Sequence, residues 1–463
     1  IKKLKDKLNK SIWADNIEKL KPHLHEQRGN IKGKSSLLML PKNTADVVKI
    51  VKFCNKNKIS IVPQGGRTGL CGGTIPNKNG NEILLSTEKM DKVIELNKDS
   101  FYMIVQAGCS LSLIKRMAFE NNRFFPLSLP SESSCTIGGN ISTNAGGAAV
   151  LKYGMTKELV EGIEVVLPNG EILNSIKNIE KDNRGFDTKY LHIGSEGTLG
   201  IITKVKIRLF PEIKKKAMAI VATNTIDNLI NFLNFAKNEC YQYFSSFEIN
   251  TNIGLNLIKK FYKDIPIPFN NKYSWYAIVE LCSYDSVNLE KKINNIIGES
   301  IKNKIIFDAI VPQNLKQYNN IWKTREFLSE AQKLNGKSIK HDISIPIETI
   351  PLFLKKAKKS LTDFRKNNIL TFGHLAEGNL HYNISKPKKM SDSVFNKLHK
   401  KVNSNIFKIV HDLGGSFSAE HGIGLIKKKE FKKYTSKEEF IIKYNLKKLL
   451  DPNNIMNPGK IFN

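Results

Sequence analysis

The stretch PQGGRTGLCGGT, residues 63–74, has five glycines in twelve residues and decides how the rest of the chain is interpreted. Before it, residues 36–63 carry the pattern of a strand, a helix opened by Thr44 or Asp46, and a second strand ending at Pro63. Glycine lets backbone N–H groups turn towards an anion and lets the backbone approach a ligand closely. Pyrophosphate is the expected guest of such a loop, although a single loop of this kind is more often a set of ordinary tight turns.

Two further loops of small residues follow, SSCTIGGNISTNAGG at 133–147 and GSEGTLGII at 194–202. Strands are predicted around them at 82–86, 101–107 and 203–211, with a strand–turn–strand at 163–173. No GxGxxG follows a strand, and GNIKGKS at 29–35 has three residues between its glycines where a P-loop requires four. Three such loops within one α+β segment are hard to explain as ordinary turns and predict a cofactor that contains phosphate.

Length and composition favour a globular protein of two or three domains, with 463 residues and 40% hydrophobic residues. From residue 213 to 370 the glycine clusters give way to longer helical patterns between strands, which indicates a second α+β domain. No segment approaches the roughly 18 apolar residues of a membrane span. The chain begins at Ile1 instead of Met, so a short N-terminal piece is expected to be missing or removed. Six cysteines without CxxC spacing indicate reduced thiols and no zinc knuckle or iron–sulfur cluster.

The formal charge of +30 invites a nucleic-acid interpretation, which the distribution of the charges does not support. Only eight of the 73 basic residues are Arg, and the lysines are spread along the whole chain without a binding motif beside them. We interpret the charge first as solvated surface and second as attraction of anionic substrates or of an acidic redox partner. No nucleic-acid partner is expected.

Residues 373–383, GHLAEGNLHYN, place two histidines on either side of a turn. If residues 376–379 form the loop between two strands, His374 lies opposite His381. Paired Cβ atoms about 5 Å apart let two imidazoles share one metal ion. On this stretch alone, two separate histidines satisfied by local hydrogen bonds are an equally good interpretation.

Together these segments resemble the vanillyl-alcohol-oxidase (PCMH-type) FAD enzymes, in order and in spacing. GHLAEGNLHYN, SAEHGIG (418–424) and NPGKIF (457–462) are similar to the D-2-hydroxy-acid dehydrogenase branch, which includes D-2-hydroxyglutarate and D-lactate dehydrogenases and the glycolate oxidase flavoprotein subunit. The resemblance implies an α+β fold: a PCMH-type FAD domain of two subdomains at 1–212, a ferredoxin-like substrate and metal cap at 213–430, and a helical C-terminal segment at 431–463 that returns to the FAD domain.

The resemblance also assigns the flavin site. The residues expected to bind FAD are Gly65, Gly66, Arg67, Thr68, Gly69 and Gly73 at the pyrophosphate, and Gly138, Gly139, Ser142, Asn144, Gly146, Glu196, Gly197, Ile201 and Asn457 along the rest of the cofactor. Some relatives attach FAD through a His in the first loop. Here Arg67 occupies that stretch with no His near it, so FAD is expected to be bound non-covalently.

The same resemblance implies a metal site of His374, His381 and Glu420, with Zn²⁺ ahead of Mn²⁺, Co²⁺ or Fe²⁺. The open coordination position would take the α-hydroxyl of the substrate, and His421 would act as general base. Taken alone, Glu420 and His421 would be an ordinary surface pair.

Residues 321–346 resemble the substrate segment of the branch. Arg325 and Ser329, four residues apart on one expected helix, Lys340 on a strand, and Asn383 are the candidates to bind the substrate acid. The D-2-hydroxyglutarate enzymes have Thr where this chain has Ser329, which weakens the case for glutarate over lactate. The alternative for Arg325 and Lys340, which is the less favoured one, is that they are ordinary solvated charges.

The implied reaction is the oxidation of a D-2-hydroxy acid, best D-2-hydroxyglutarate, to the 2-oxo acid. The alternatives are a D-lactate dehydrogenase, a glycolate oxidase subunit, or a non-redox protein that kept the fold, as an ether-lipid synthase of the superfamily did. Because the chain has no iron–sulfur ligands or nicotinamide motif, the electron acceptor must be external: an electron-transfer flavoprotein, a quinone or a cytochrome. A homodimer is left open, and the expected location is the cytoplasm, or the mitochondrial matrix in a eukaryote, with peripheral membrane attachment also open.

Overall fold

The computed structural model describes residues 2–27, 29, 31–179 and 181–462. Contacts divide the chain into two compact units: residues 1–147, 153–212 and 420–463 form the first, and residues 148–152 and 213–419 form the second. Ile1, on which the expectation of a missing N-terminal piece rests, lies outside the described residues.

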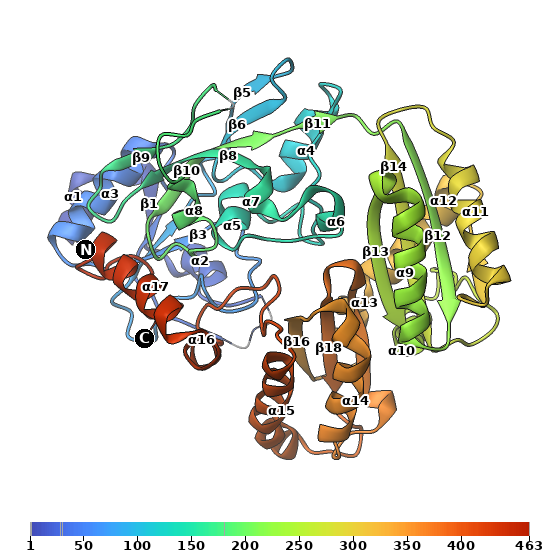
Figure 1. Cartoon of the computed structure of the whole chain (residues 1–463). Coiled ribbons are helices and arrows are strands. Elements are labelled where there is room, and N and C mark those ends of the chain that lie inside the picture. Colours follow the sequence, from blue (N-terminus) through green and yellow to red (C-terminus); the bar gives the residue numbers. More distant parts are fainter. Residues whose placement is uncertain (1, 28, 30, 180, 463) are drawn as a thin grey trace. The chain divides into compact units, whose positions relative to one another are not determined.

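In its described residues the first unit contains strands β1 to β11, with helices before, between and after them (Figure 1). Its strands are β1 (Trp13–Ala14), β2 (Leu38–Met39), β3 (Ile61–Gln64), β4 (Ile83–Ser86), β5 (Val93–Asn97), β6 (Tyr102–Gln106), β7 (Arg123–Phe124), β8 (Val160–Val166), β9 (Ile172–Asn174), β10 (Ile201–Arg208) and β11 (Phe210–Pro211). Its helices are α1 (Lys2–Lys7), α2 (Ile17–Leu20), α3 (Thr44–Lys56), α4 (Leu111–Phe119), α5 (Ile137–Ser142), α7 (Thr156–Leu159), α8 (Lys189–His192), α16 (Lys428–Tyr434) and α17 (Lys437–Leu450), with 3₁₀ turns η1 (Lys10–Ile12) and η2 (Lys21–His23).

Two larger sheets build this unit, which matches a fold of two subdomains. The order β1-β2-β4-β3 gives a small sheet in which β4 runs parallel to β2 and to β3. The order β5-β6-β10-β8-β9 gives an antiparallel sheet. The chain returns to the first sheet at its C-terminal end, where Met456 forms a parallel bridge with Ile61. Ile455 and Met456 are buried there in the same core as α3.

Most of the expected elements of this unit are present. Helix α3 begins at Thr44, but its N-cap is Asn43, whose side chain accepts a hydrogen bond from the Asp46 N–H. An Asn oxygen at the N-cap binds one of the free N–H groups of the first turn, so the helix opens at Thr44, one of the two expected residues, with Asn43 as its cap. Strand β5 was not predicted, because its residues VIELN are only partly buried at a sheet edge and lack a clear alternation.

The second unit is built on one seven-stranded sheet (Figure 1). Its strands are β12 (Lys215–Thr223), β13 (Phe244–Thr251), β14 (Trp275–Ser283), β15 (Asp308–Ile310), β16 (Ser338–Ser344), β17 (Ile369–His374) and β18 (Asn379–Ser385). Its helices are α9 (Ile226–Cys240), α10 (Asn252–Phe261), α11 (Leu289–Lys302), α12 (Leu315–Glu326), α13 (Leu328–Leu334), α14 (Ile350–Ser360) and α15 (Asp392–Asp412), with η3 (Tyr241–Tyr243), η4 (Ile347–Thr349), η5 (Lys366–Asn368) and η6 (Leu375–Glu377). Helix α6 (Val150–Tyr153) lies where the two units divide.

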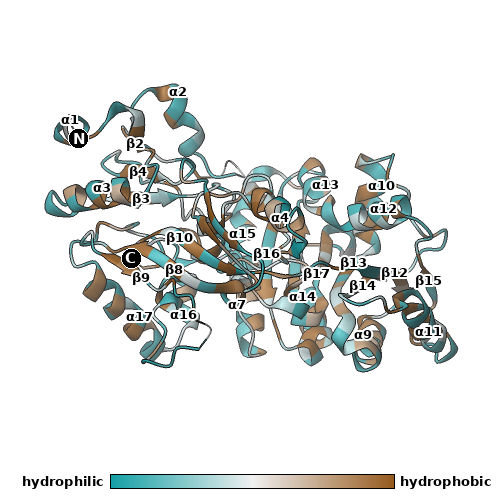
Figure 2. Ribbon diagram, turned by 90° about the horizontal axis from the view of Figure 1, so that it is seen from above, coloured by the Kyte–Doolittle hydropathy of each residue, from teal (hydrophilic) through white to brown (hydrophobic). Residues whose placement is uncertain are grey.

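The strand order is β15-β12-β14-β13-β17-β18-β16, and every pair is antiparallel. Alternate residues of β12 point to opposite faces. Met218, Ile220 and Ala222 share a core with helices α10 and α12. The helices are amphipathic, and Figure 2 shows brown and teal sides on α9 and α11. Both units mix helices and sheets, which confirms the predicted α+β class. Among the described residues no helix is long and apolar enough to cross a membrane.

Candidate flavin and metal sites

The first glycine loop follows β3 and packs tightly against the second loop. A Cβ atom added at Gly66 would lie 1.9 Å from the carbonyl oxygen of Ser134, and one added at Gly65 would lie 2.3 Å from Thr136 Oγ1. Only glycine permits this backbone approach. Arg67 has φ = 58°, and its guanidinium lies 3.2 Å from Glu88 and 3.2 Å from His23 Nδ1. The side chain of Arg67 therefore binds other side chains of the protein, while its backbone forms the turn.

The second loop opens helix α5. Thr136 is its N-cap residue, and a Cβ at Gly138 would lie 2.6 Å from that of Ala107. Ser142 donates its hydroxyl to the Gly138 carbonyl at 2.7 Å. Asn144 has φ = 47°, and its side-chain oxygen accepts from the Lys157 N–H at 2.9 Å. The predicted small residues of this loop thus lie in and directly after α5.

The third loop is tied to the returning C-terminal segment. Glu196 has φ = 51°, and its carboxylate accepts hydrogen bonds from the backbone N–H groups of Ile423 at 2.6 Å and Gly424 at 2.8 Å. Burial raises the pKa of Glu196, and these two hydrogen bonds oppose the rise. The Glu196 side chain holds the turn that follows His421. Ile201, in contrast, is buried on β10 among core residues.

Asn457 joins two of these loops from the C-terminal tail. Its side-chain nitrogen donates to the carbonyl oxygens of Gly73 at 2.9 Å and Glu196 at 2.8 Å, and its φ is 46°. Lys447, on α17, donates to the Thr198 carbonyl at 2.9 Å. The tail therefore packs on the glycine loops.

The loops fit a ligand on two grounds. Four residues predicted at the flavin adopt the left-handed conformation that residues other than glycine rarely adopt: Arg67, Asn144, Glu196 and Asn457. Three buried polar atoms of the same loops have no hydrogen-bond partner within the described part of the chain, namely Thr136 Oγ1, Asn140 Oδ1 and Asn457 Oδ1. Such atoms are expected where a polar cofactor supplies the missing partner.

The histidine hairpin of the second unit is formed by β17 and β18, with a register that differs from the predicted one. His381 pairs with Phe372, not with His374. The connection is residues 375–378, one position earlier than the predicted 376–379, with Leu375–Glu377 in the turn η6 and Gly378 closing it with φ = 68°. His374 lies two residues from Phe372, so it is a diagonal neighbour of His381 on the same face. The ring centres are 5.8 Å apart, close enough for both rings to reach one ion at bonds of about 2.1 Å.

His374 is held by a carboxylate that the sequence interpretation missed. Glu248, on β13, pairs with His374 across the strands and accepts a hydrogen bond from its Nδ1. The same carboxylate accepts a 2.6 Å hydrogen bond from Arg325 Nε. Burial alone would raise the pKa of Glu248, but Arg325 and His374 outweigh it and lower the pKa to about 2. The local sequence FEIN, residues 247–250, gives no signal of this role, because the partners Arg325 and His374 are 77 and 126 residues away from Glu248.

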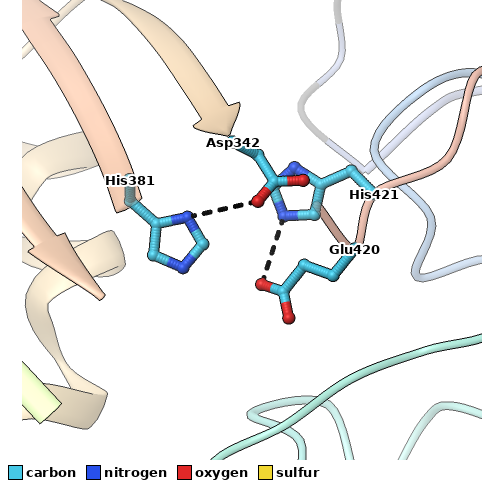
Figure 3. A group of neighbouring side chains, drawn as sticks. All are labelled: Asp342, His381, Glu420 and His421. Carbon is cyan, nitrogen blue, oxygen red and sulfur yellow. Dashed lines mark ion pairs between the residues drawn. The ribbon is translucent and has the colours of Figure 1, made fainter. Parts of the chain in front are cut away.

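His381 also faces a carboxylate that was not predicted. Asp342, on β16, pairs with His381 across the strands, and its Oδ1 lies 3.8 Å from His381 Nδ1 (Figure 3). Asn379 donates to the same oxygen at 3.1 Å. A signal for Asp342 was present, since it lies two residues after Lys340 and therefore on the same face of the strand.

Glu420 and His421 follow directly on the second unit, at the start of the returning segment. The N–H of Ala419, the last residue of the second unit, donates to the Asp342 carbonyl at 3.3 Å. His421 Nε2 lies 3.9 Å from Glu420 Oε1 (Figure 3). Asp342 and His381 in the second unit, and Glu420 and His421 in the returning segment, are potential metal ligands among the described residues. The role of His374 as a ligand stays a prediction.

The predicted substrate residues lie on three elements. Arg325 is near the end of α12, whereas Ser329 is exposed on α13, so the two do not share one helix as expected. The chain turns at Phe327 between them. Lys340 lies on β16, as predicted, opposite Asn383 on β18. Asn383 is buried, and its side chain bonds the His341 N–H at 3.2 Å and Gln332 at 2.9 Å.

Comparison with known families identifies the class of protein. The family described as "FAD binding domain" matches residues 35–175, and the family described as "FAD linked oxidases, C-terminal domain" matches residues 213–461. The second match covers more than half of the chain. The protein therefore belongs to the family of FAD-linked oxidases, which are oxidoreductases, and it carries an FAD-binding domain.

Curated relatives narrow this class. A probable mitochondrial D-2-hydroxyglutarate dehydrogenase of Oryza sativa subsp. indica is 35% identical over 435 residues, which cover 94% of this chain and 76% of the relative. The D-2-hydroxyglutarate dehydrogenase of Stutzerimonas stutzeri (strain A1501) is 32% identical over 432 residues, with 92% and 91% covered. A putative mitochondrial D-lactate dehydrogenase of Schizosaccharomyces pombe is 32% identical, with 93% and 82% covered. The predicted resemblance to this dehydrogenase branch is confirmed.

Solved structures confirm the fold. p-Cresol methylhydroxylase with bound substrate superposes with a TM-score of 0.77 at 15% identity, covering 99% of this chain and 95% of that chain. An alkyldihydroxyacetonephosphate synthase superposes with a TM-score of 0.75 at 17% identity, covering 99% and 84%. At these identities the likeness shows the PCMH-type fold alone.

Proposed function

We propose that this protein oxidises a D-2-hydroxy acid to the 2-oxo acid with FAD as electron acceptor, and that D-2-hydroxyglutarate is its leading substrate. One observation in the second unit carries the proposal. Two histidines, His374 and His381, and one arginine, Arg325, lie next to the buried carboxylates of Glu248 and Asp342. The names of the rice and Stutzerimonas relatives support the choice of substrate.

Arg325 and Lys340 are the proposed cations for the substrate carboxylates. The Nε of Arg325 is bonded to Glu248, and its guanidinium lies 4.9 Å from the centre of the Phe372 ring. With Nε fixed, the two terminal nitrogens are the atoms that can bind a carboxylate as a planar fork. Lys340 supplies a point charge from β16, and the exposed hydroxyl of Ser329 would contribute a further donor.

The donor set fits a divalent metal. His374 and His381 are imidazole ligands whose Nδ1 atoms face Glu248 and Asp342, which leaves Nε2 as the ring atom that could reach an ion. Glu420 is the proposed carboxylate ligand, and two His with one carboxylate is a donor set of catalytic Zn²⁺ sites. His421 is the proposed base that takes the proton of the α-hydroxyl on a ring nitrogen.

When bound, the metal would lower the pKa of the α-hydroxyl and FAD would take the hydride from the α-carbon. The hydroxyl proton goes to His421, the C–H electron pair leaves with the hydride, and the C–O bond becomes a carbonyl. Because FAD must then be reoxidised, we propose an external acceptor: an electron-transfer flavoprotein, a quinone or a cytochrome. Non-covalent FAD and a homodimer remain part of this proposal.

A second candidate substrate is D-lactate. It is favoured by Ser329 in place of Thr and by the name of the Schizosaccharomyces relative. Glycolate belongs to the same alternative. The two substrate classes differ in the distal carboxylate, which only D-2-hydroxyglutarate carries.

The test is anaerobic reduction of the flavin, followed near 450 nm, about the position of the oxidised flavin band. D-2-hydroxyglutarate, D-lactate, glycolate and the L-isomers are added to the purified protein before and after EDTA. We expect rapid bleaching by D-2-hydroxyglutarate, loss of bleaching after EDTA with the flavin retained, and recovery with Zn²⁺. Bleaching by D-lactate alone would move the assignment to the second candidate, and bleaching by no acid would refute both.

A further inference from the structure

Glu248 is a buried carboxylate at the centre of the sheet. Its side chain is 1% exposed, and it lies on β13, which pairs with β14 on one side and β17 on the other. An ionised carboxylate is costly to bury unless charged partners surround it. Here both of its oxygens are bonded to cationic or ionisable groups, Oε1 to His374 and Oε2 to Arg325.

The register of the strands fixes one of these contacts. Glu248 lies directly opposite His374, and Phe372 pairs with Asn250 on the same two strands. Directly opposed residues have Cβ atoms about 5 Å apart, so the hydrogen bond to His374 Nδ1 follows from the sheet itself. A hydrogen bond at Nδ1 keeps the proton there and presents the Nε2 lone pair, which is the form of histidine that binds a metal.

The other contact fixes a guanidinium. Arg325 reaches Glu248 from α12, and its side chain is 13% exposed. The 2.6 Å bond takes up Nε, and the Phe372 ring lies 4.9 Å from the guanidinium carbon. With one edge bonded and one face on an aromatic ring, the plane of the guanidinium is set before any ligand arrives.

We propose that Glu248 is a positioning residue that couples the metal site to the substrate site. The inference rests on the proposed function, in which His374 binds the metal and Arg325 binds the substrate carboxylate. One carboxylate orients both groups, so loss of its charge frees the His374 tautomer and the Arg325 plane together. Removal of Glu248 therefore weakens metal binding and substrate binding in the same variant, although Glu248 touches neither ligand.

The neighbouring strand supplies a matched control. Glu280, on β14, is also buried and is also bonded to α12, through Tyr318 and through Trp322 Nε1 at 3.2 Å. It differs from Glu248 in its partners, which among the described residues are Ser245, Tyr318 and Trp322 and include neither His374 nor Arg325. Glu280→Gln therefore measures the structural effect of a neutral amide at a buried position that also bonds to α12.

The experiment measures Zn²⁺ affinity by competition with a chelator, and the KM for D-2-hydroxyglutarate, in the parent, Glu248→Gln and Glu280→Gln proteins. We expect Glu248→Gln to lower Zn²⁺ affinity by about 10- to 100-fold, the usual effect of losing a carboxylate behind a histidine ligand. The KM should rise about fivefold or more, the lower end of couplings between two sites. Glu280→Gln should change neither quantity. Metal affinity in His374→Ala should fall no further when Glu248→Gln is added, because Glu248 acts through His374.

Two results would overturn the inference. If the parent binds Zn²⁺ and is reduced by D-2-hydroxyglutarate, but Glu248→Gln has unchanged Zn²⁺ affinity, then Glu248 is not a positioning residue. The proposed function would stay intact in that case. Equal losses in Glu280→Gln would show a merely structural role. A parent that binds no Zn²⁺ would instead refute the metal-dependent function, and the coupling with it.

A further measurement needs no change at Glu248. Nitrogen NMR of metal-free parent protein labelled at histidine, with His374 assigned by its loss in His374→Gln, should show His374 protonated at Nδ1. Protonation at Nε2 alone would refute the inference even if Glu248→Gln failed to fold.

Discussion

Replacing Lys447 by Met tests how the C-terminal tail is held on the glycine loops. Lys447 and Asp451 form a buried ion pair at 2.5 Å, with side chains 8% and 1% exposed. Lys447 also donates to the carbonyls of Thr198 at 2.9 Å and Met456 at 2.7 Å, and Asp451 accepts from the N–H groups of Ile455 and Met456. Removing the cation leaves a carboxylate buried without its counter-charge, which typically costs about 3–5 kcal/mol.

The assay is urea unfolding followed by flavin fluorescence, which reports the unit that carries the glycine loops. With a slope of about 3 kcal/mol per molar urea, the midpoint should fall by about 1–1.7 M. Lys448→Met is the matched control, because Lys448 is the next residue of α17 and is exposed. Its midpoint should move by no more than about 0.2 M, as for an ordinary surface substitution. Adding Asp451→Asn to Lys447→Met should recover part of the loss, since no charge is then left buried. A midpoint for Lys447→Met equal to that of the control would refute the reasoning.

Two further predictions concern the pH dependence of stability and the histidine hairpin. Burial lowers the pKa of His192 from 6.5 to about 4, so between these values the unfolded chain binds a proton that the folded chain does not. The free energy of unfolding should therefore fall by up to about 3 kcal/mol as the pH drops from 6.5 to 4, and His192→Gln should remove this slope in urea titrations at pH 4.5 and 7. A slope that persists in the variant would assign the effect to other groups. Gly378→Ala should destabilise the hairpin by about 1–3 kcal/mol, because φ is 68° and the new Cβ would lie 2.0 Å from the Ile345 carbonyl oxygen. Thermal unfolding checks this against Gly298→Ala on α11, where nothing lies within 4 Å and a helix former should stabilise by up to about 1 kcal/mol; equal melting temperatures for the two variants would contradict it.

Local sequence predicted the glycine loops well because their chemistry is local. Close approach of two backbones requires glycine on at least one of them, and this requirement is visible in QGGRTG and TIGGN without any knowledge of the partner. The left-handed backbone of Arg67 and Glu196 could not be read in the same way. Asn tolerates that conformation, as at Asn144 and Asn457, whereas Arg and Glu adopt it only when the surrounding fold imposes it.

The hairpin register was wrong for a related reason. The predicted loop at 376–379 and the observed one at 375–378 have the same length, and both suit the letters LAEGN. The observed pairing of Phe372 with His381 is shifted by two residues from the predicted one, and such a shift changes every cross-strand pair. The choice is made by Gly378, which closes the turn with its Cα facing the Ile345 carbonyl, a group 33 positions earlier in the chain. The sequence correctly predicted that the two histidines are neighbours, but it could not predict which residues of the adjacent strands lie opposite each of them.

The order of the strands supplies what the turn does not. The hairpin β17–β18 lies between β13 and β16, and each flanking strand places one buried carboxylate opposite one histidine: Glu248 opposite His374, and Asp342 opposite His381. Both carboxylates face an Nδ1 atom, so each imidazole has a carboxylate on its Nδ1 side, supplied by a different strand. Because each ring has its own carboxylate on a flanking strand, the two histidines do not need to pair directly across the turn. A diagonal placement is sufficient for both rings to approach one ion. For the proposed metal site, this arrangement implies that the hairpin sequence alone is insufficient and that the acidic residues at the matching positions of both flanking strands are needed to orient the histidines.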